Sequence, residues 1–307
     1  MSEPFNLVAI LGPTASGKTA FAAHLALRIN GEVISADSRQ VYRQMNLGTG
    51  KDYADYQISG NHVPFHLTDL VDPGYRYSVF EYQRDFFRIF RDIQSRKKFP
   101  VLCGGSGMYL EAATRGYKLV DVPKDESLRA ALGSKTLDEL TAILSSLKSP
   151  HNITDTDNPE RALRAIEIAV YYRDKPAQAH DLPVINPLFI GIRYDREEER
   201  NRITMRLQER LRQGMVAEVE HLLSLGLTPD QLHYYGLEYR YITHYLQGLT
   251  DYPTMVSLLN TAIHQFAKRQ RTWFRKMERE GTCIHWLHGQ MPTPQKIETV
   301  LKLMGRK

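Results

Sequence analysis

The segment LVAILGPTASGKT, residues 7–19, joins a short apolar run to the spacing glycine, four residues, glycine-lysine-threonine. The glycines let the backbone wrap a phosphate group, Lys18 can reach its outer oxygens, and the Thr19 hydroxyl can bind Mg²⁺. A helical pattern at residues 19–29 follows, which completes a strand, loop and helix. A glycine-rich turn without a ligand is the alternative. The predicted phosphate-binding residues are Gly12, Pro13, Thr14, Ala15, Ser16, Gly17, Lys18 and Thr19.

Further short apolar runs predict buried strands at residues 32–35, 100–103 and 188–194. Helical patterns lie between or after these runs. The alternation predicts an α/β fold in which helices flank a parallel sheet, with ligands bound at the carboxyl ends of the strands.

The sequence pattern of the chain changes after about residue 118. Residues 124–180 carry helical patterns without a convincing strand, and residues 149–160 form a turn-rich joint. After the strand at 188–194 the pattern is helical to about residue 279. We therefore expect a P-loop core over residues 1–120, a helical insertion domain over 121–186, and the returning core strand with C-terminal helices over 187–307.

Bulk composition sets few limits on function. Lysine and arginine number 40 against 35 acidic residues, an excess too small by itself to indicate a nucleic-acid partner. The two cysteines, Cys103 and Cys283, have no CxxC partner, so neither a disulfide framework nor a zinc site is indicated. The amino terminus lacks a signal pattern and no window resembles a membrane span. We expect a soluble, cytoplasmic protein without a membrane partner.

A phosphate loop alone does not name a substrate, because kinases, ATPases and other transferases share it. NTPases usually place an aspartate at the end of a later strand to hold Mg²⁺. The strand at 100–103 ends instead in GGSGMYL, without an acid, whereas Asp37 directly follows the strand at 32–35. Asp37 is therefore a candidate general base beside the phosphates. A helix cap formed by Asp37 or Ser38 is the alternative.

The glycine-rich turn at residues 104–107 lets a ligand or a second backbone approach closely, and Ser106 can offer its hydroxyl to a bound base or phosphate. A plain strand-to-helix turn is the alternative. The arginines over residues 196–210 include pairs four apart that share a helix face, preceded by three glutamates. A solvated, salt-bridged helix is the default there, and phosphate contact by one or two arginines, Arg202 among them, is the sharper hypothesis.

Residues 262–279 hold six basic residues against one acid, with Trp273 and Phe274 interleaved. Basic side chains with aromatic rings on one helix suit phosphate backbones and base stacking. An ordinary amphipathic helix with a core tryptophan is the alternative.

The ordered motifs GPTASGKT, SADSRQVYRQMNLGTGKD, GGSGMYL, NPERALRAIEI, YYGLEY and AKRQRTWFR resemble the tRNA dimethylallyltransferase (isopentenyltransferase) family over about residues 7–280. That family has a P-loop α/β core with a helical insertion. It transfers a five-carbon allyl group from dimethylallyl diphosphate to the exocyclic amine of the adenosine 3′ of the tRNA anticodon. The resemblance implies that the loop holds the diphosphate leaving group, and that the adenosine is flipped out of the anticodon loop.

By this resemblance Lys18 and Thr19 hold the diphosphate and its Mg²⁺ cofactor, Arg202 adds a phosphate contact, and Asp37 accepts the amine proton. GTGKD at residues 48–52 departs from the more usual GTAKP, and Ser106 stands where threonine is usual. The missing C-terminal zinc finger suggests a bacterial or organellar type. We expect the protein to be a monomer. The residues matched to tRNA contacts are Asp37, Ser38, Arg39, Gln40, Ser106, Arg129, Glu160, Arg161, Arg164, His233, Tyr235, Gly236, Glu238, Lys268, Arg269, Gln270, Arg271, Trp273, Phe274 and Arg275.

Two other function classes share part of this pattern. A small-molecule or nucleotide kinase would use the same loop but would consume ATP. A non-catalytic P-loop RNA-binding module would bind tRNA without chemistry. Whether ATP also enters the loop stays open at this stage.

Overall fold

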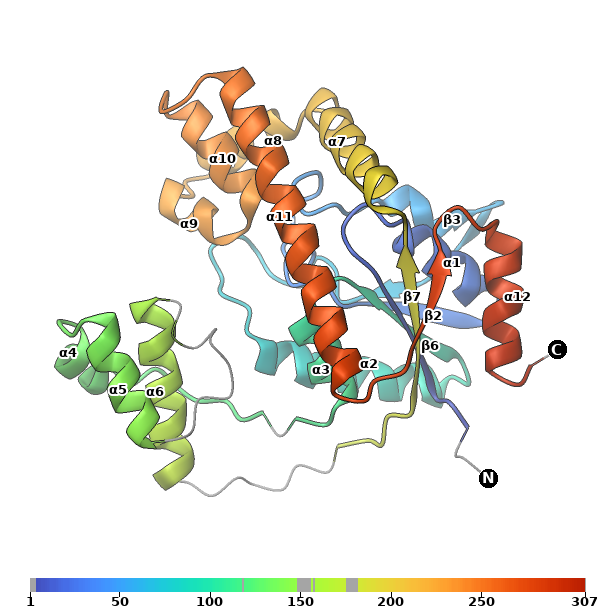
Figure 1. Cartoon of the computed structure of the whole chain (residues 1–307), viewed down its shortest axis with the longest axis horizontal. Helices are drawn as coiled ribbons and strands as arrows, with labels where there is room; N and C mark the ends of the chain where they lie inside the picture. Colours follow the sequence, from blue (N-terminus) through green and yellow to red (C-terminus); the bar gives the residue numbers. More distant parts are fainter. Residues whose placement is uncertain (1–3, 118, 148–155, 157, 175–181, 307) are drawn as a thin grey trace. The chain divides into compact units, whose positions relative to one another are not determined.

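The structure is a computed structural model that describes residues 4–117, 119–147, 156, 158–174 and 182–306. Within these residues one sheet has the strand order β5-β2-β6-β1-β7-β8, and every neighbouring pair is parallel (Figure 1). The predicted parallel sheet of an α/β fold is thus confirmed. The strands are β1 Leu7–Leu11, β2 Gly31–Ser35, β5 Phe65–His66, β6 Phe99–Gly104, β7 Pro187–Arg193 and β8 Ile284–His288.

Strand β1 lies inside the sheet, between β6 and β7, and all five of its residues are buried. Val8 and Ile10 point into a core that also contains Leu25 and Val300. Because side chains alternate along a strand, the other β1 residues point to the opposite face. Burial on both faces explains why these strands are continuous apolar runs in the sequence.

Helices cover both faces of this sheet (Figure 1). Helices α1 and α12 pack together over one face, and α2 and α3 pack together over the other. A short helix η1, Tyr53–Tyr56, leads into the hairpin of β3, Gln57–Ile58, and β4, Asn61–His62. The helices outside the insertion are α1 Lys18–Arg28, α2 Val79–Ser95, α3 Gly107–Thr114, α7 Arg196–Arg212, α8 Met215–Ser224, α9 Pro229–Tyr234, α10 Leu237–Leu246, α11 Tyr252–Arg279 and α12 Thr293–Leu303.

The chain divides into two compact units, one made of Met1–Tyr117 with Pro183–Lys307 and the other of Lys118–Leu182. The second unit contains α4 Glu126–Leu132, α5 Leu137–Leu147 and α6 Pro159–Asp174. Its own small core joins leucines of α5 to alanine and isoleucine side chains of α6. The turn-rich joint predicted at residues 149–160 lies mostly outside the described residues.

Two strands of the six-stranded sheet escaped the sequence analysis. Strand β5 has two residues, and β8 mixes histidine and tryptophan with its apolar residues, so neither forms a recognisable apolar run. Strand β8 pairs with β7, with Phe189 opposite Ile284, and extends the sheet at that edge. No helix in the described part of the chain has the length and apolar character needed to cross a membrane.

Candidate functional site

A cavity of about 490 Å³ lies within the first unit, where β1, β2, β6 and β7 end. Its walls come from the glycine-rich loop after β1, the segment after β2, the turn after β6, and helices α7 and α11. The loops after parallel strands meet at one edge of the sheet, which explains why residues far apart in sequence share this cavity.

The loop after β1 has the geometry of a phosphate cradle. A Cβ on Gly12 would lie 2.7 Å from a β7 carbonyl oxygen, so no larger residue fits there, and Gly17 has a φ of 74°. The Lys18 ammonium donates to the Pro13 carbonyl at 3.3 Å, and burial lowers the pKa of Lys18. The Ser16 hydroxyl is buried without a hydrogen-bond partner in the described residues. Such a loop lacks an acceptor that a phosphate oxygen supplies.

Asp37 lines the same cavity. Its Oδ1 accepts a hydrogen bond from the Arg39 N–H at 2.9 Å, and no helix begins between residues 36 and 52, a fully described segment. Asp37 therefore stabilises a turn, and the helix-cap alternative does not apply. Burial lowers the pKa of Lys18, and the negative charge of Asp37 opposes this shift without reversing it. The carboxylate and the ammonium thus act on each other electrostatically.

The glycine-rich turn after β6 serves close packing. A Cβ on Gly104 would lie 2.1 Å from the Ala36 carbonyl oxygen, which brings the ends of β6 and β2 together. The Ser106 hydroxyl accepts a hydrogen bond from the Ser38 N–H at 3.2 Å. Ser106 lines the cavity, and it also fixes the segment that follows Asp37.

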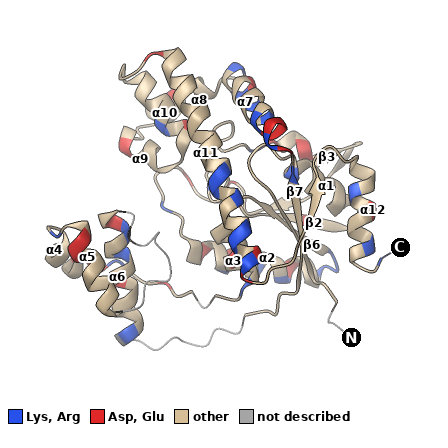
Figure 2. Cartoon of the chain, viewed as in Figure 1, with Lys and Arg blue, Asp and Glu red and all other residues tan. Residues whose placement is uncertain are grey.

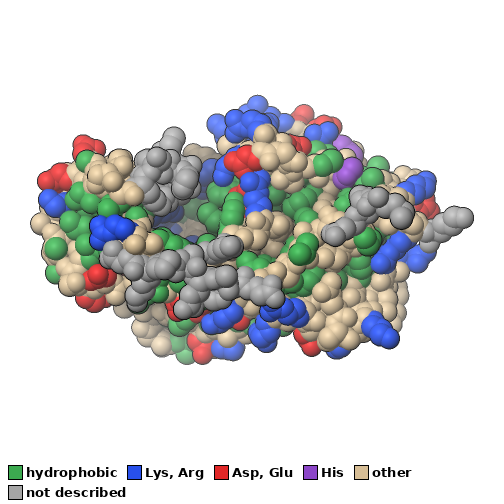
Figure 3. All heavy atoms as spheres, turned by 90° about the horizontal axis from the view of Figure 1, so that it is seen from below, with side chains coloured by type: hydrophobic (Ala, Val, Ile, Leu, Met, Phe, Trp, Pro, Cys, Tyr) green, Lys and Arg blue, Asp and Glu red, His purple; other side chains and the backbone are tan. Residues whose placement is uncertain are grey.

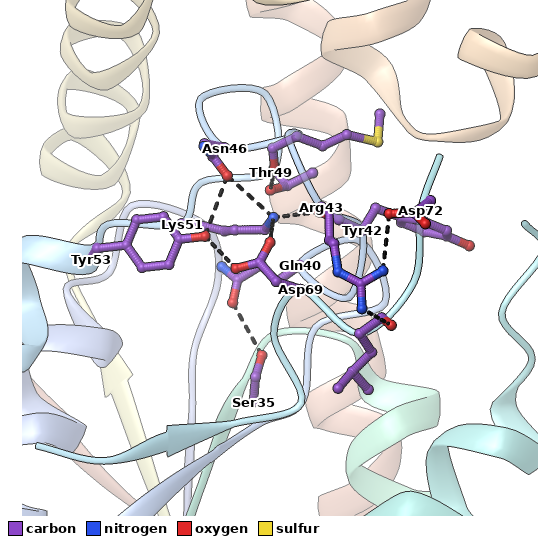
Figure 4. Close-up of polar contacts among 12 residues, drawn as sticks. Ser35, Gln40, Tyr42, Arg43, Asn46, Thr49, Lys51, Tyr53, Asp69 and Asp72 are labelled. Carbon is purple, nitrogen blue, oxygen red and sulfur yellow. Dashed lines mark hydrogen bonds and ion pairs between the residues drawn. The ribbon is translucent and has the colours of Figure 1, made fainter. Parts of the chain in front are cut away.

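A polar cluster that the sequence analysis missed supports the segment after β2 (Figure 4). The Lys51 ammonium is almost completely buried and donates to Asp69 Oδ1 at 2.5 Å and to the Tyr42 carbonyl. Burial lowers the pKa of Lys51. The Gln40 amide donates to the Gly50 carbonyl at 3.0 Å, so it positions the loop as well as lining the cavity.

Three arginines of helix α7 line the cavity, whereas the sequence analysis selected Arg202 alone. The Arg202 Nε donates to the Ala15 carbonyl at 3.0 Å. Arg206 and Arg210 follow at successive helical turns and pair with Asp52. The spacing of four residues, noted in the sequence, places them on the same helix face as Arg202.

Gln270 of helix α11 connects two loops of the cavity. Its Oε1 accepts from the Thr14 N–H at 2.8 Å, and its Nε2 donates to the Gly105 carbonyl at 3.0 Å. The resemblance had matched Gln270 to a tRNA contact. In the structure the side chain is 7% exposed, and its amide is taken up by these two bonds.

The two aromatic residues of α11 differ in their surroundings. The Trp273 ring lines the cavity, packs over Gly107 and donates to Glu111 Oε2 at 3.0 Å. Burial raises the pKa of Glu111. Phe274 is fully buried. Its ring packs in the interior and presents no face to an RNA, which corrects the expectation that it contacts tRNA.

Figure 2 shows lysine and arginine residues along α11, and only some of them are exposed. Lys268, Arg269 and Arg275 are exposed, whereas Arg271 forms an ion pair with the buried Glu199 of α7. On the face drawn in Figure 3, lysine and arginine side chains gather in several separate clusters. Arg271 therefore links α11 to α7, whereas Lys268, Arg269 and Arg275 face the solvent.

The end of α9, the start of α10 and the two residues between them contribute the remaining predicted residues of this unit. Gly236 and Glu238 line the cavity, and burial raises the pKa of Glu238. Tyr235 also borders it but is 2% exposed. The His233 ring lies 4.8 Å from the His244 ring, and burial lowers the pKa of His233.

In the second unit, Arg129 and Arg164 both pair with the buried Glu167, at 2.6 and 3.0 Å. The attraction of the two guanidiniums lowers the pKa of Glu167 despite its burial, which by itself raises it. Glu160 and Arg161 are exposed at the start of α6. Arg129 and Arg164 therefore have a structural role within the helical unit, whatever else they contact.

The sheet, the glycine-rich loop and the cavity define a P-loop α/β protein. Two family models match it, one described as "IPP transferase" over residues 40–277 and one described as "Isopentenyl transferase" over residues 5–64. The chain belongs to the IPP transferase family.

Relatives of known name support this assignment. The chain is 53% identical to tRNA dimethylallyltransferase 1 of Parabacteroides distasonis, with 99% of each chain covered. It is 56% identical to tRNA dimethylallyltransferase 2 of Bacteroides fragilis, with 96% of this chain and 97% of the relative covered. These relatives are not kinases, which favours the transferase interpretation over the kinase alternative.

Solved structures show the same fold. The tRNA isopentenylpyrophosphate transferase of Bacillus halodurans matches with a TM-score of 0.71 and 31% identity, covering 98% of this chain and 95% of that one. A eukaryotic dimethylallyltransferase acting on tRNA matches with a TM-score of 0.79 and 22% identity, covering 98% and 80%.

Proposed function

We propose that the protein transfers a dimethylallyl group from dimethylallyl diphosphate to the exocyclic amine of the adenosine 3′ of the tRNA anticodon. The allylic carbon–oxygen bond breaks, a carbon–nitrogen bond forms, and diphosphate leaves with the electron pair. The amine loses one proton. The observation that carries the proposal is that Lys18, Thr19 and Asp37 line one cavity.

The phosphate loop supports a diphosphate leaving group. Lys18 supplies a positive charge, and Arg202, bonded to the Ala15 carbonyl, supplies another beside the loop. The unpaired hydroxyl of Ser16 can donate to a phosphate oxygen. Developing negative charge on the leaving oxygen is stabilised most by donors that are held in place beforehand.

Asp37 supports proton removal. The lone pair of an adenine amine is delocalised into the ring, so attack on carbon leaves a positive nitrogen that must lose its proton. A carboxylate within hydrogen-bond reach orients the amine and accepts that proton. The bond from the Arg39 N–H holds Asp37 Oδ1 in place in a turn, with the carboxylate facing the cavity.

We propose that Mg²⁺ would be held jointly by the protein and the diphosphate. No cluster of three or more histidine, cysteine or carboxylate side chains among the described residues could hold a metal by itself. The Thr19 hydroxyl, which lines the cavity, would therefore bind the ion together with phosphate oxygens. When bound there, the ion would neutralise charge on the leaving group.

The exposed basic residues of α11, Lys268, Arg269 and Arg275, suit the phosphate backbone of tRNA. Trp273 and Arg39 line the cavity, and an indole ring and a guanidinium plane suit an unstacked adenine. We expect a monomer to carry out the reaction. A tRNA substrate implies action in the cytoplasm.

The test is the mass of a tRNA after incubation with the protein, dimethylallyl diphosphate and Mg²⁺. The proposal expects a gain of one five-carbon allyl unit on the adenosine next to the anticodon and release of diphosphate. Stoichiometric ATP consumption with phosphorylated product would show a kinase instead. Binding of tRNA with no change in mass would show a binding module.

A further inference from the structure

Helix α7 presents positive charge to the cavity at two places along its length. Arg202 lies beside the phosphate loop, where its Nε donates to the Ala15 carbonyl. Arg206 and Arg210, one and two turns further along, line the same cavity. The loop backbone therefore holds Arg202, whereas Arg206 and Arg210 require another partner.

That partner is Asp52. Its Oδ2 accepts from Arg206 at 2.8 Å, and its Oδ1 lies 3.3 Å from an Arg210 nitrogen. The side chain of Asp52 is 45% exposed, against 30% for Arg206 and 11% for Arg210. One carboxylate thus faces two guanidiniums, and it is the member of the group best placed to turn away into water.

Gly50, close to Asp52 in sequence, also lies against Arg206 and Arg210. Gly50 has a φ of 76°, and a Cβ there would lie 2.5 Å from an Arg210 nitrogen and 2.8 Å from an Arg206 nitrogen. Gly50 and Asp52 are the two positions at which GTGKD departs from the family's usual GTAKP. One departure leaves space for the two guanidiniums and the other supplies an opposite charge, so both adapt the loop to these arginines.

We propose that Asp52 is an internal counter-anion that competes with the diphosphate group for Arg206 and Arg210 and thereby lowers the affinity of the cavity for diphosphate. The inference rests on the proposed function, which puts diphosphate in this cavity. An entering diphosphate brings several negative charges close to the Asp52 carboxylate, and the arginines must exchange one anion for the other. A weaker hold favours release of the diphosphate product after each turnover.

The experiment is calorimetric titration of inorganic pyrophosphate, with Mg²⁺ present, into the wild-type protein and Asp52→Asn. Removing one negative charge from the wall of the cavity should lower the dissociation constant by about tenfold. Glu209→Gln is the matched control, because Glu209 lies on the same helix outside the cavity and pairs with Arg212 at 3.1 Å. Its pyrophosphate affinity should equal that of the wild type.

Three results would count against the inference in distinguishable ways. Unchanged affinity in Asp52→Asn overturns it, and weaker affinity shows that Asp52 holds the arginines in place for the phosphates. A wild-type protein that binds no pyrophosphate refutes the proposed diphosphate site, and the inference with it. Thermal unfolding of each variant separates these outcomes from a loss of folded protein.

Discussion

Replacing Gln270 with leucine removes the connection between helix α11 and two loops of the cavity while keeping the size of the side chain similar. The change leaves the Thr14 N–H and the Gly105 carbonyl without their partner. An unsatisfied buried group costs about 1–3 kcal/mol, and the Thr14 bond is only partly buried, so we expect a loss of about 2–4 kcal/mol in the free energy of unfolding. Since Thr14 belongs to the phosphate loop, the KM for dimethylallyl diphosphate should also rise.

The assay is urea unfolding of wild-type protein, Gln270→Leu and the neighbouring Arg269→Gln, followed by steady-state kinetics for both substrates. Arg269 is exposed, so its replacement should change the free energy of unfolding by less than about 0.5 kcal/mol and weaken tRNA binding. The reasoning is refuted if Gln270→Leu keeps its full stability and its donor KM and loses only tRNA affinity. That result would make Gln270 a direct tRNA contact.

Three further changes test other parts of the site and the fold. Lys18→Ala should abolish transfer. Because burial lowers the pKa of Lys18, kcat/KM of the wild type for the donor should fall with rising pH already below the ordinary lysine pKa of 10.5. A flat pH profile up to that value would contradict this. The hydrogen bond from Arg96 lowers the pKa of Glu32. The ionised carboxylate therefore adds to the free energy of unfolding at neutral pH, and this contribution is lost as pH falls through the lowered pKa. Glu32→Gln should therefore cost roughly 2–3 kcal/mol of unfolding free energy at neutral pH, and the difference should shrink in acid unfolding experiments; a constant difference would count against the ion pair. Lys268→Glu with Arg275→Glu should weaken tRNA binding and flatten its salt dependence while pyrophosphate affinity stays the same; equal losses for both ligands would indicate a folding defect.

The sequence predicts well what depends on local pattern. Strands β1, β2, β6 and β7 are short, mostly apolar runs because helices bury both of their faces. The phosphate loop has a fixed spacing because its backbone must wrap an anion. Asp37 could be selected because it follows a strand directly, and parallel strands end at one edge of the sheet. Strand β8 was missed because histidines interrupt its apolar residues, so only its pairing with β7 identifies it as a strand.

What depends on tertiary packing was beyond sequence reasoning. Phe274 and Trp273 are neighbours in an aromatic and basic stretch, yet one is buried in the core and the other lines the cavity. Nothing local distinguishes them, because only the position of α11 against α3 decides which ring faces inward. Lys51 is a further case, since its buried ammonium depends on Asp69, a distant residue.

The account depends most on Asp37 as the base beside the diphosphate site. The most direct test is single-turnover transfer of the allyl group to tRNA by wild-type protein and Asp37→Asn, with both substrates saturating. The amide keeps the shape of the side chain and loses its basicity, so the rate should fall by about 10²- to 10⁴-fold while the affinities for tRNA and pyrophosphate stay within a few fold. An Asp37→Asn protein that transfers the group at nearly the wild-type rate would contradict the account and assign the proton to another group of the cavity.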